Sequence, residues 1–337
     1  MVFLQVSDIH IGECRTLPGY LDRHKKVLEQ VIEKAKEYRT SPIQLVVAGD
    51  LCEKNPTFAE QCLVAWFLGQ IERNGIETIL ISGNHCHIGS GRTELDLFAE
   101  LPYKHLHIFT KPGFHKAYAG HGSDIGFICL PWKGYTREQL KDLVETYLPN
   151  ISECTYKVVV LHECIVGSKT DYGMTLPKGT SIPSIPEITY WAIGDIHGYQ
   201  MSNVANGWYA GAPLQLTFGD KLPKGILEVD LHDPTRPKFI PLLSKPMVTV
   251  SSIEEITEDA HYKVKGDLET ILKANRLDSV VKTDWDNRSA KSIEYKKMGI
   301  TDGLPEFLAE EGLQEKWQIK AVIWVERFLS LKVNEEV

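Results

Sequence analysis

The sequence predicts an α/β fold built from layered β-sheets, and two patterns carry that prediction. Up to about residue 245, apolar β-prone runs alternate with amphipathic stretches of helical periodicity. After Asn150 strands dominate, which suits layered sheets better than a simple doubly wound sheet. A third pattern bears on function, because a short polar cluster stands directly after each of several apolar runs.

The individual elements follow from residue type and spacing. Runs rich in β-branched and aromatic residues predict strands at 2–6, 43–47, 78–81, 158–161 and 190–193. Apolar residues recur with a helical period at 21–38, 59–72 and 137–147. Further on, 208–213 and 224–229 are expected to be strands on either side of an irregular loop at 216–220.

Three segments are expected along the chain: a main domain at 1–245, a small α+β cap domain at 246–298, and a linker with a C-terminal helical pair at 299–337. The composition shifts after Pro246, and a helix-like stretch follows at 267–275. Within the last segment, Trp324 and Phe328 belong to an apolar stripe at helical spacing. Such a stripe packs on its own domain or binds a partner. The second interpretation gains weight because the stripe follows a linker and covers more than one face.

Composition limits the class of protein. The 337 residues are 43% hydrophobic, enough for a sizeable core, and 37 basic against 45 acidic residues give a formal charge of 37 − 45 = −8. This charge argues against a chain that coats nucleic acid by itself, but not against a nuclease whose carboxylates bind metal. The seven cysteines form no Cys-x-x-Cys pair, and no run approaches a membrane span. We therefore expect a soluble protein of the reducing cytoplasm.

The polar clusters at the strand ends are the strongest functional signal. Because the carboxyl ends of strands in α/β sheets gather at one rim, these side chains are expected to lie close together. Their members are oxygen and nitrogen ligands for metals: Asp8, His10, Asp50, Asn84, His85, His162, Asp195 and His197.

A pair of divalent cations needs a bridging carboxylate, further ligands on each ion, and open positions for water and substrate. Asp50 is the natural bridge, and Asn84 offers a neutral carbonyl oxygen. The alternation of a strand would send Asp8 and His10 to the same side. Any one such pair is more often a turn or a cap, so the prediction of a two-metal site depends on the full ordered set.

Other polar residues admit two interpretations. His162 alone could be a buried core histidine. Glu53 could lie behind the metal ligands or on the surface, and the sequence does not decide between the two. The histidines at 87, 105, 107, 115 and 121 have no zinc-site spacing and are expected to be exposed or near DNA.

The order Asp-x-His, Gly-Asp, Gly-Asn-His, single His and Gly-Asp-x-His resembles the calcineurin-like metallophosphoesterases. Within them the chain looks most like the SbcD-type repair nucleases, and the phage-encoded members in particular. Further segments fall where such nucleases carry similar ones: 49–54, Leu130-Pro131-Trp132, 192–197, 209–213 and Phe218-Gly219-Asp220. The resemblance covers about the first 240 residues and implies two stacked mixed β-sheets flanked by helices.

The resemblance also implies roles for single residues. One ion would be held by Asp8, His10, Asp50 and His197, and the other by Asp50, Asn84, His162 and Asp195. The ions would be two Mn²⁺, with Mg²⁺ as a substitute. His85 would be catalytic, facing the scissile phosphate and stabilising the transition state or protonating the leaving oxygen.

Two positions depart from the family pattern. Cys86 stands where relatives have an aspartate after the histidine, so the carboxylate that orients His85 is missing or comes from elsewhere, and modest turnover is expected. Asp195 stands where many relatives have a histidine. A carboxylate remains a good Mn²⁺ ligand, so the charge of the site changes but the metal is kept.

By resemblance, the expected function is Mn²⁺-dependent hydrolysis of DNA phosphodiesters in recombination and double-strand-break repair. The expected partners are DNA, a second copy of the chain, and a coiled-coil ATPase of the SMC (SbcC-like) type that docks on the helical pair through Trp324 and Phe328. One alternative is a phosphatase or small-molecule phosphodiesterase of the same fold. Another is a DNA-end-binding scaffold whose catalysis has decayed around Cys86.

Overall fold

The computed structural model describes residues 1–89, 92–118, 124–170, 173–221, 223–266, 268–274, 277 and 279–285. The chain divides into two compact units, Met1–Pro246 and Met247–Val337. The predicted linker and helical pair at 299–337, with Trp324 and Phe328, lie outside the described residues.

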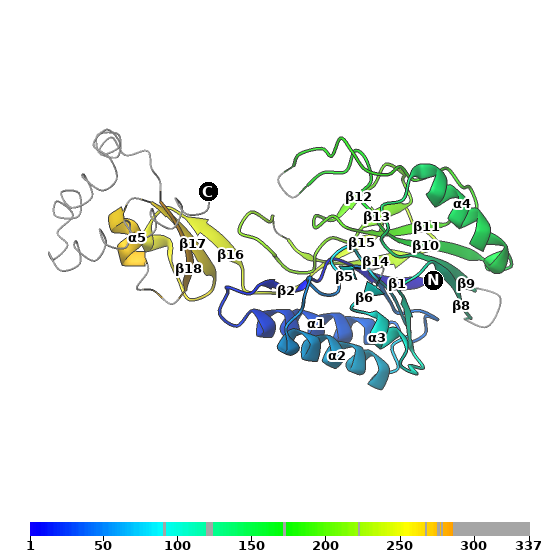
Figure 1. The fold of residues 1–337 in the computed structure, drawn as a ribbon, viewed down its shortest axis with the longest axis horizontal. Coiled ribbons are helices and arrows are strands. Elements are labelled where there is room, and N and C mark those ends of the chain that lie inside the picture. The colour runs from blue at the N-terminus through cyan, green and yellow to red at the C-terminus, as the bar shows by residue number, and fades with distance from the viewer. Residues whose placement is uncertain are drawn as a thin grey trace, which may run out of the picture. The chain divides into compact units, whose positions relative to one another are not determined.

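The first unit contains two six-stranded sheets (Figure 1). The first sheet has the order β15-β14-β1-β3-β4-β7, with bounds Lys238–Pro241, Gly225–Asp230, Val2–Val6, Leu45–Ala48, Thr78–Ile81 and Leu106–Phe109. The second has the order β12-β13-β11-β10-β9-β8, with bounds Gln200–Met201, Gly207–Tyr209, Tyr190–Gly194, Tyr156–His162, Ile125–Leu130 and Gly113–Ala117. In each sheet the central strands are parallel and antiparallel strands lie outside them, so both sheets are mixed.

The helices of this unit are α1 (Tyr20–Lys36), α2 (Phe58–Arg73), α3 (Asp96–Ala99) and α4 (Arg137–Tyr147), followed by a 3₁₀ turn, η1 (Leu148–Ile151). Three short strands, β2 (Ile11–Cys14), β5 (His87–Gly89) and β6 (Arg92–Thr93), complete it. Helix α4 begins as its sequence predicts, because Thr136 and Gln139 form a reciprocal capping box with bonds of 3.2 and 3.0 Å.

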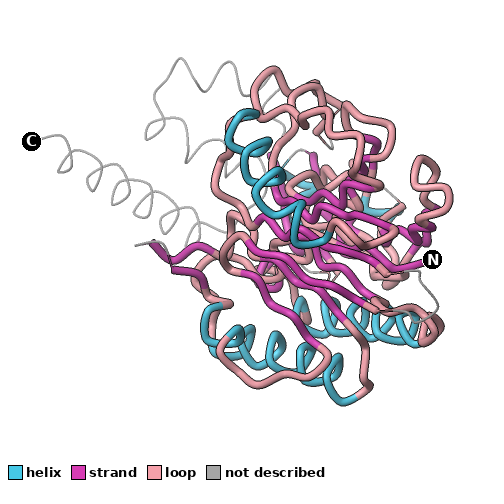
Figure 2. The backbone as a smooth tube through the Cα atoms, turned by 90° about the vertical axis from the view of Figure 1, so that its right-hand side faces the viewer, coloured by secondary structure: helices cyan, strands magenta, loops and turns pink. Residues whose placement is uncertain are grey.

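Three buried clusters of apolar side chains separate four layers. Leu4 and Val6 of β1 pack toward α1 and α2, whereas Phe3 of the same strand faces the second sheet, as the alternation of a strand requires. Val159 of β10 packs toward α4 on the other outer face. Figure 2 shows the strands at the centre of this unit and helices on its outside. The predicted pair of stacked mixed sheets flanked by helices is confirmed.

The second unit has a three-stranded parallel sheet of β16 (Met247–Val250), β17 (His261–Gly266) and β18 (Val280–Trp285). It also contains helix α5 (Leu268–Ala274) and a 3₁₀ turn, η2 (Ile253–Glu255). Val250, Tyr262 and Val264 belong to its own small core.

All seven cysteines lie among the described residues and are free thiols. None of the helices described has both the length and the apolar character needed to cross a membrane.

Candidate metal centre

The predicted polar residues lie at or just beyond the C-terminal ends of β1, β3, β4, β10 and β11, the central parallel strands of the two sheets. Asp8, His10, Asp50 and His162 are buried, with at most 2% of each residue exposed. Asn84, His85, Asp195 and His197 are partly exposed. The rim thus has a buried floor of ligands and a more open side, where a substrate would arrive.

The backbone bends sharply at four of these residues. Strand β1 ends at Val6, and the φ angles of Asp8, His10, Asp50 and Asp195 are 52°, 48°, 49° and 101°. Such angles cost non-glycine residues about 1–3 kcal/mol each and gather at functional sites. Asp8 and His10 do lie on one side, as expected, but strand alternation is not the cause. Both side chains reach the rim because the chain has already left the strand.

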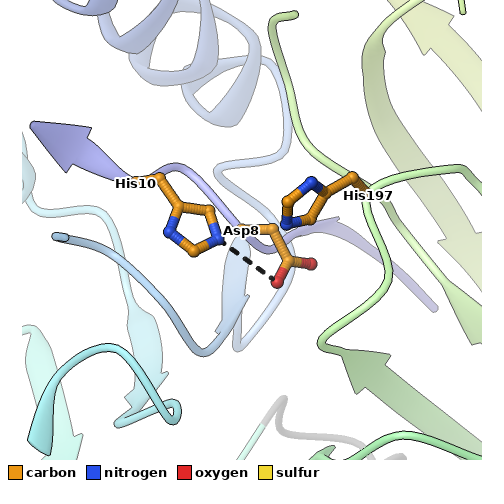
Figure 3. A group of neighbouring side chains, drawn as sticks. All are labelled: Asp8, His10 and His197. Carbon is orange, nitrogen blue, oxygen red and sulfur yellow. Dashed lines mark ion pairs between the residues drawn. The ribbon is translucent and has the colours of Figure 1, made fainter. Parts of the chain in front are cut away.

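Asp8, His10 and His197 form the first group of potential ligands, and their side chains converge in Figure 3. Their ligand atoms lie within 4.8 Å of one another. His10 Nε2 lies 4.0 Å from Asp8 Oδ1 and 3.6 Å from Asp50 Oδ2. These spacings leave room for one cation among the three side chains and Asp50.

A second group centres on His162. Its Nε2 lies 3.3 Å from Asp50 Oδ2 and 3.7 Å from Asp195 Oδ1, and Asp8, Asp50 and His162 also qualify together as potential ligands. Asn84 Nδ2 donates to Asp195 Oδ1 at 3.1 Å, which directs the amide oxygen of Asn84 elsewhere. Asp8 is thus common to both groups, and Asp50 Oδ2 lies beside a histidine of each, His10 in the first and His162 in the second. The bridging position of Asp50 stays a prediction.

Three atoms of the predicted metal ligands are buried without a hydrogen-bond partner: His10 Nε2, His162 Nε2 and Asn84 Oδ1. An unpaired buried polar atom costs about 1–3 kcal/mol, so such atoms call for an explanation. The Nδ1 of His162 lies 2.7 Å from the Ala48 carbonyl oxygen, so Nδ1 donates there and Nε2 is the ring atom left for a metal. All three atoms are those that a metal ion would use. The residues present therefore fit a divalent cation.

Two glycines make the close approach of the ligands possible. A Cβ atom at Gly49, where φ is +96°, would lie 2.0 Å from His162 Nδ1. A Cβ atom at Gly83 would lie 2.1 Å from Asp50 Oδ1. Any larger residue at either position would displace a ligand, which explains why glycine precedes the ligand in both clusters.

The charges at the rim favour a cation. Burial lowers the pKa of His10, but the contact with Glu53 and the charges of Asp50 and Asp8 outweigh it and raise that pKa to about 9. For Asp195, burial is the main cause, and it raises the pKa to about 7. The charges of Asp8 and Asp50 raise this pKa further, whereas the charge of His162 lowers it. Protons on these groups thus partly neutralise a crowded set of carboxylates.

Metal binding is expected to release protons and to strengthen with pH. A metal ligand must be deprotonated, and His10 and Asp195 lose their protons as the pH rises through about 9 and about 7. Titration of the metal-free protein with Mn²⁺ between pH 6 and 9, by calorimetry in buffers of different ionisation enthalpy, measures both effects. An affinity that does not change with pH would contradict this assignment of the ligands.

Segments behind the ligands hold them in place. Lys224 Nζ donates to the carbonyl oxygen of His197 at 2.8 Å and lies 3.5 Å from Asp220 Oδ2. Asp220 also accepts a hydrogen bond from the backbone N–H of Leu216 at 2.8 Å. Lys224 and Asp220 are both buried. The segment Phe218-Gly219-Asp220 therefore has a structural role, because it anchors the lysine that supports the His197 loop.

His85 lies beside the first group of ligands. Its ring centroid is 4.6 Å from that of His10, and its backbone N–H donates to Asp50 Oδ1 at 2.9 Å. Its side chain is 33% exposed, against 3% for His10. His85, His10 and Asp50 also meet the geometric condition for a metal group, so the geometry alone permits His85 as a ligand. Its exposure fits a residue that faces the substrate.

Glu53 is the residue whose place the sequence left open. Its carboxylate contacts the Nδ1 atoms of both His85 and His10, at 2.6 and 3.1 Å, and its side chain is only 15% exposed. The carboxylate next to His85 thus comes from Glu53 and not from position 86. One signal in the sequence pointed there, since Glu53 lies three residues beyond Asp50 on the same rim.

Changing Cys86 to aspartate is expected to destabilise the protein without raising its activity. Cys86 is fully buried, its thiol interacts with that of Cys52, and Asp50 and Glu94 lie nearby. A carboxylate there would be desolvated beside other acids, at a cost of several kcal/mol. Thermal unfolding and turnover of a nitrophenyl phosphodiester measure the two effects. Higher activity with unchanged stability would show that Glu53 does not serve His85 adequately.

Comparison with known proteins agrees with this centre. The sequence profile of the calcineurin-like phosphoesterases matches residues 1–199. No curated protein matches the chain in sequence.

Among solved structures, the calcineurin-like phosphoesterase YfkN from Bacillus subtilis aligns with 15% identity and a TM-score of 0.39, covering 68% of this chain and 84% of its own. TT1561 of Thermus thermophilus aligns with 12% identity and a TM-score of 0.42, covering 71% and 98%. With the profile match over more than half of its length, the chain belongs to the calcineurin-like phosphoesterases, a family of metal-dependent phosphoester hydrolases.

Proposed function

We propose that the chain is a Mn²⁺-dependent DNA nuclease that hydrolyses phosphodiester bonds in recombination and double-strand-break repair. The observation that carries the proposal is the place of His85, a partly exposed imidazole beside a buried cluster of metal ligands. A DNA diester loses an alkoxide, which is a strong base, so a proton donor next to the phosphate aids its departure. The segments resembling SbcD-type nucleases point to the same substrate.

In this proposal Asp8, His10, Asp50 and His197 would hold one ion, and Asp50, Asn84, His162 and Asp195 would hold the other. Oxygen and imidazole ligands suit Mn²⁺, with Mg²⁺ as a substitute. When bound, the ions would supply an activated water and stabilise negative charge on the phosphate. The seven free cysteines are consistent with action in the reducing cytoplasm.

The test is release of nucleotides from linear duplex DNA by the purified protein with Mn²⁺ or Mg²⁺, with a chelator as the blank. The Asp50→Ala variant, purified in the same way, controls for contaminating nucleases. Manganese-dependent degradation by the wild type alone supports the proposal. DNA binding without turnover would instead identify an end-binding scaffold, and the nuclease proposal would be wrong.

A hydrolase of small phosphoesters is the second candidate, and the net charge of −8 favours it. Contacts between basic side chains and phosphates supply most of the non-specific affinity for DNA, so an acidic chain gains little from that source. Hydrolysis of nitrophenyl or nucleotide esters without any action on duplex DNA would favour this candidate.

The nuclease proposal includes a dimer of this chain and an SMC-type ATPase that docks on the C-terminal helical pair. Every candidate ligand belongs to the unit Met1–Pro246. A chain ending at Gly299 is therefore expected to fold and to bind Mn²⁺ but to lose the ATPase. Co-purification with the ATPase and thermal unfolding are the measurements.

A milder variant changes both Trp324 and Phe328 to alanine, since large apolar side chains dominate many interfaces. Aggregation of the shortened chain, or failure to bind Mn²⁺, would mean that the helices belong to the core. A folded short chain that still captures the ATPase would place the contact elsewhere.

A further inference from the structure

One carboxylate lies between two histidines that have different expected tasks. Glu53 Oε1 is 2.6 Å from Nδ1 of His85, and Glu53 Oε2 is 3.1 Å from Nδ1 of His10. The His10 and His85 rings stand nearly perpendicular, at 88°. A carboxylate accepts hydrogen bonds at both oxygens, so each ring donates through Nδ1. In both rings Nε2, on the other side of the ring, remains available to contact a metal ion or the substrate.

Glu53 is itself held firmly. Its backbone N–H donates to the carbonyl oxygen of Ile11 at 2.9 Å, and the backbone N–H of Lys54 donates to Oε1 at 3.0 Å. Gly12, with φ of +115°, allows this approach, because a Cβ atom there would lie 3.1 Å from the Cβ of Glu53. The carboxylate is thus fixed to the segment that immediately follows His10.

We propose that Glu53 is a positioning residue that sets the orientation of His10 and His85 together. For His10 it directs Nε2, which is buried and unpartnered, to the metal. For His85 it fixes the ring whose Nε2 serves the leaving group. Glu53 thereby couples the geometry of the first metal to that of the proton donor. The inference rests on the phosphoester hydrolysis of the family and holds whether or not DNA is the substrate.

The effect follows from the number of acceptors. Glutamine at position 53 keeps the shape but offers one acceptor oxygen and one NH₂ group, so only one ring keeps its Nδ1–H bond. Loss of such a partner behind a metal ligand lowers metal affinity or activity by about 10–100-fold. Misorientation of His85 acts on the chemical step, so kcat falls and KM changes little.

The experiment compares Glu53→Gln with Glu94→Gln on two esters of thymidine 5′-phosphate, one with a 4-nitrophenyl and one with a phenyl leaving group. Glu94 is a matched control. It lies on a neighbouring loop and binds Cys52 Sγ and the backbone N–H of Asn55, but it contacts neither histidine. Hydrolysis of the phenyl ester depends more on a proton donor than hydrolysis of the nitrophenyl ester, because phenolate is a stronger base than 4-nitrophenolate. Titration of each metal-free protein with Mn²⁺ gives a readout that does not depend on turnover.

For Glu53→Gln we expect a loss in kcat of about 10–100-fold on the phenyl ester, a smaller loss on the nitrophenyl ester, and weaker binding of Mn²⁺. Glu94→Gln should match the wild type, and all three proteins should unfold at similar temperatures. Wild-type kcat and Mn²⁺ affinity in Glu53→Gln would overturn the proposal. Equal losses in both variants, or a change confined to KM, would overturn it as well. Inactivity toward duplex DNA alone would contradict only the nuclease proposal.

Discussion

Changing Asp50 to alanine is expected to abolish phosphoester hydrolysis and to weaken binding of both metal ions. Asp50 is 1% exposed, and its Oδ2 lies 3.6 Å from His10 Nε2 and 3.3 Å from His162 Nε2. Its carboxylate lies beside one histidine of each group of ligands, so its removal affects both. The stabilisation of charge that each ion supplies is worth several kcal/mol, so activity should fall by about a thousandfold or more.

Metal content of the purified variant, measured by elemental analysis, tests this expectation. Asp50 also accepts the backbone N–H of His85 at 2.9 Å, so alanine removes a local hydrogen bond as well. Asp50→Asn separates the two effects, because it keeps an acceptor oxygen of the same shape but loses the charge. Two tightly bound ions in Asp50→Ala would show that another residue bridges the metals.

The strand ends at the rim were predictable because they depend on local sequence. The run at 78–81 is mostly β-branched and apolar, and a polar cluster follows it directly, so both the strand and the place of Asn84 after its end could be predicted. Helix α4 was predicted at its observed bounds because its apolar residues recur with a helical period, and the capping box at Thr136 fixes its start. Such features need no knowledge of distant contacts.

The part played by Glu53 was not predictable in the same way. Its contact with His10 depends on the bridge between Ile11 and Cys52, which joins segments about forty residues apart. The positive φ angles of Asp8 and His10 are likewise imposed by the surrounding structure, since neither residue type requires them. The missing carboxylate after His85 was visible in the sequence, but its replacement appears only when the two loops meet.

Changing His85 to alanine is expected to lower hydrolysis by about 10²–10⁴-fold while leaving both metal ions bound, as for the loss of a general acid. The side chain is 33% exposed, and its Nδ1 is engaged by Glu53 at 2.6 Å. The predicted ligands of both ions remain in the variant. Glu53 also keeps its contacts with His10 and the backbone of Lys54, so the first metal group should retain its geometry.

His105→Ala is a matched control for this variant. His105 also donates from Nδ1 to a glutamate at 2.6 Å, in this case Glu77, and its side chain is 23% exposed. It precedes β7, at the opposite end of the strands from the ligands, so its loss should affect neither activity nor metal content. Metal content and turnover of both variants separate the two possible roles of His85. If His85→Ala loses an ion together with its activity, His85 is a metal ligand beside His10 and Asp50, and the leaving group must take its proton from another source.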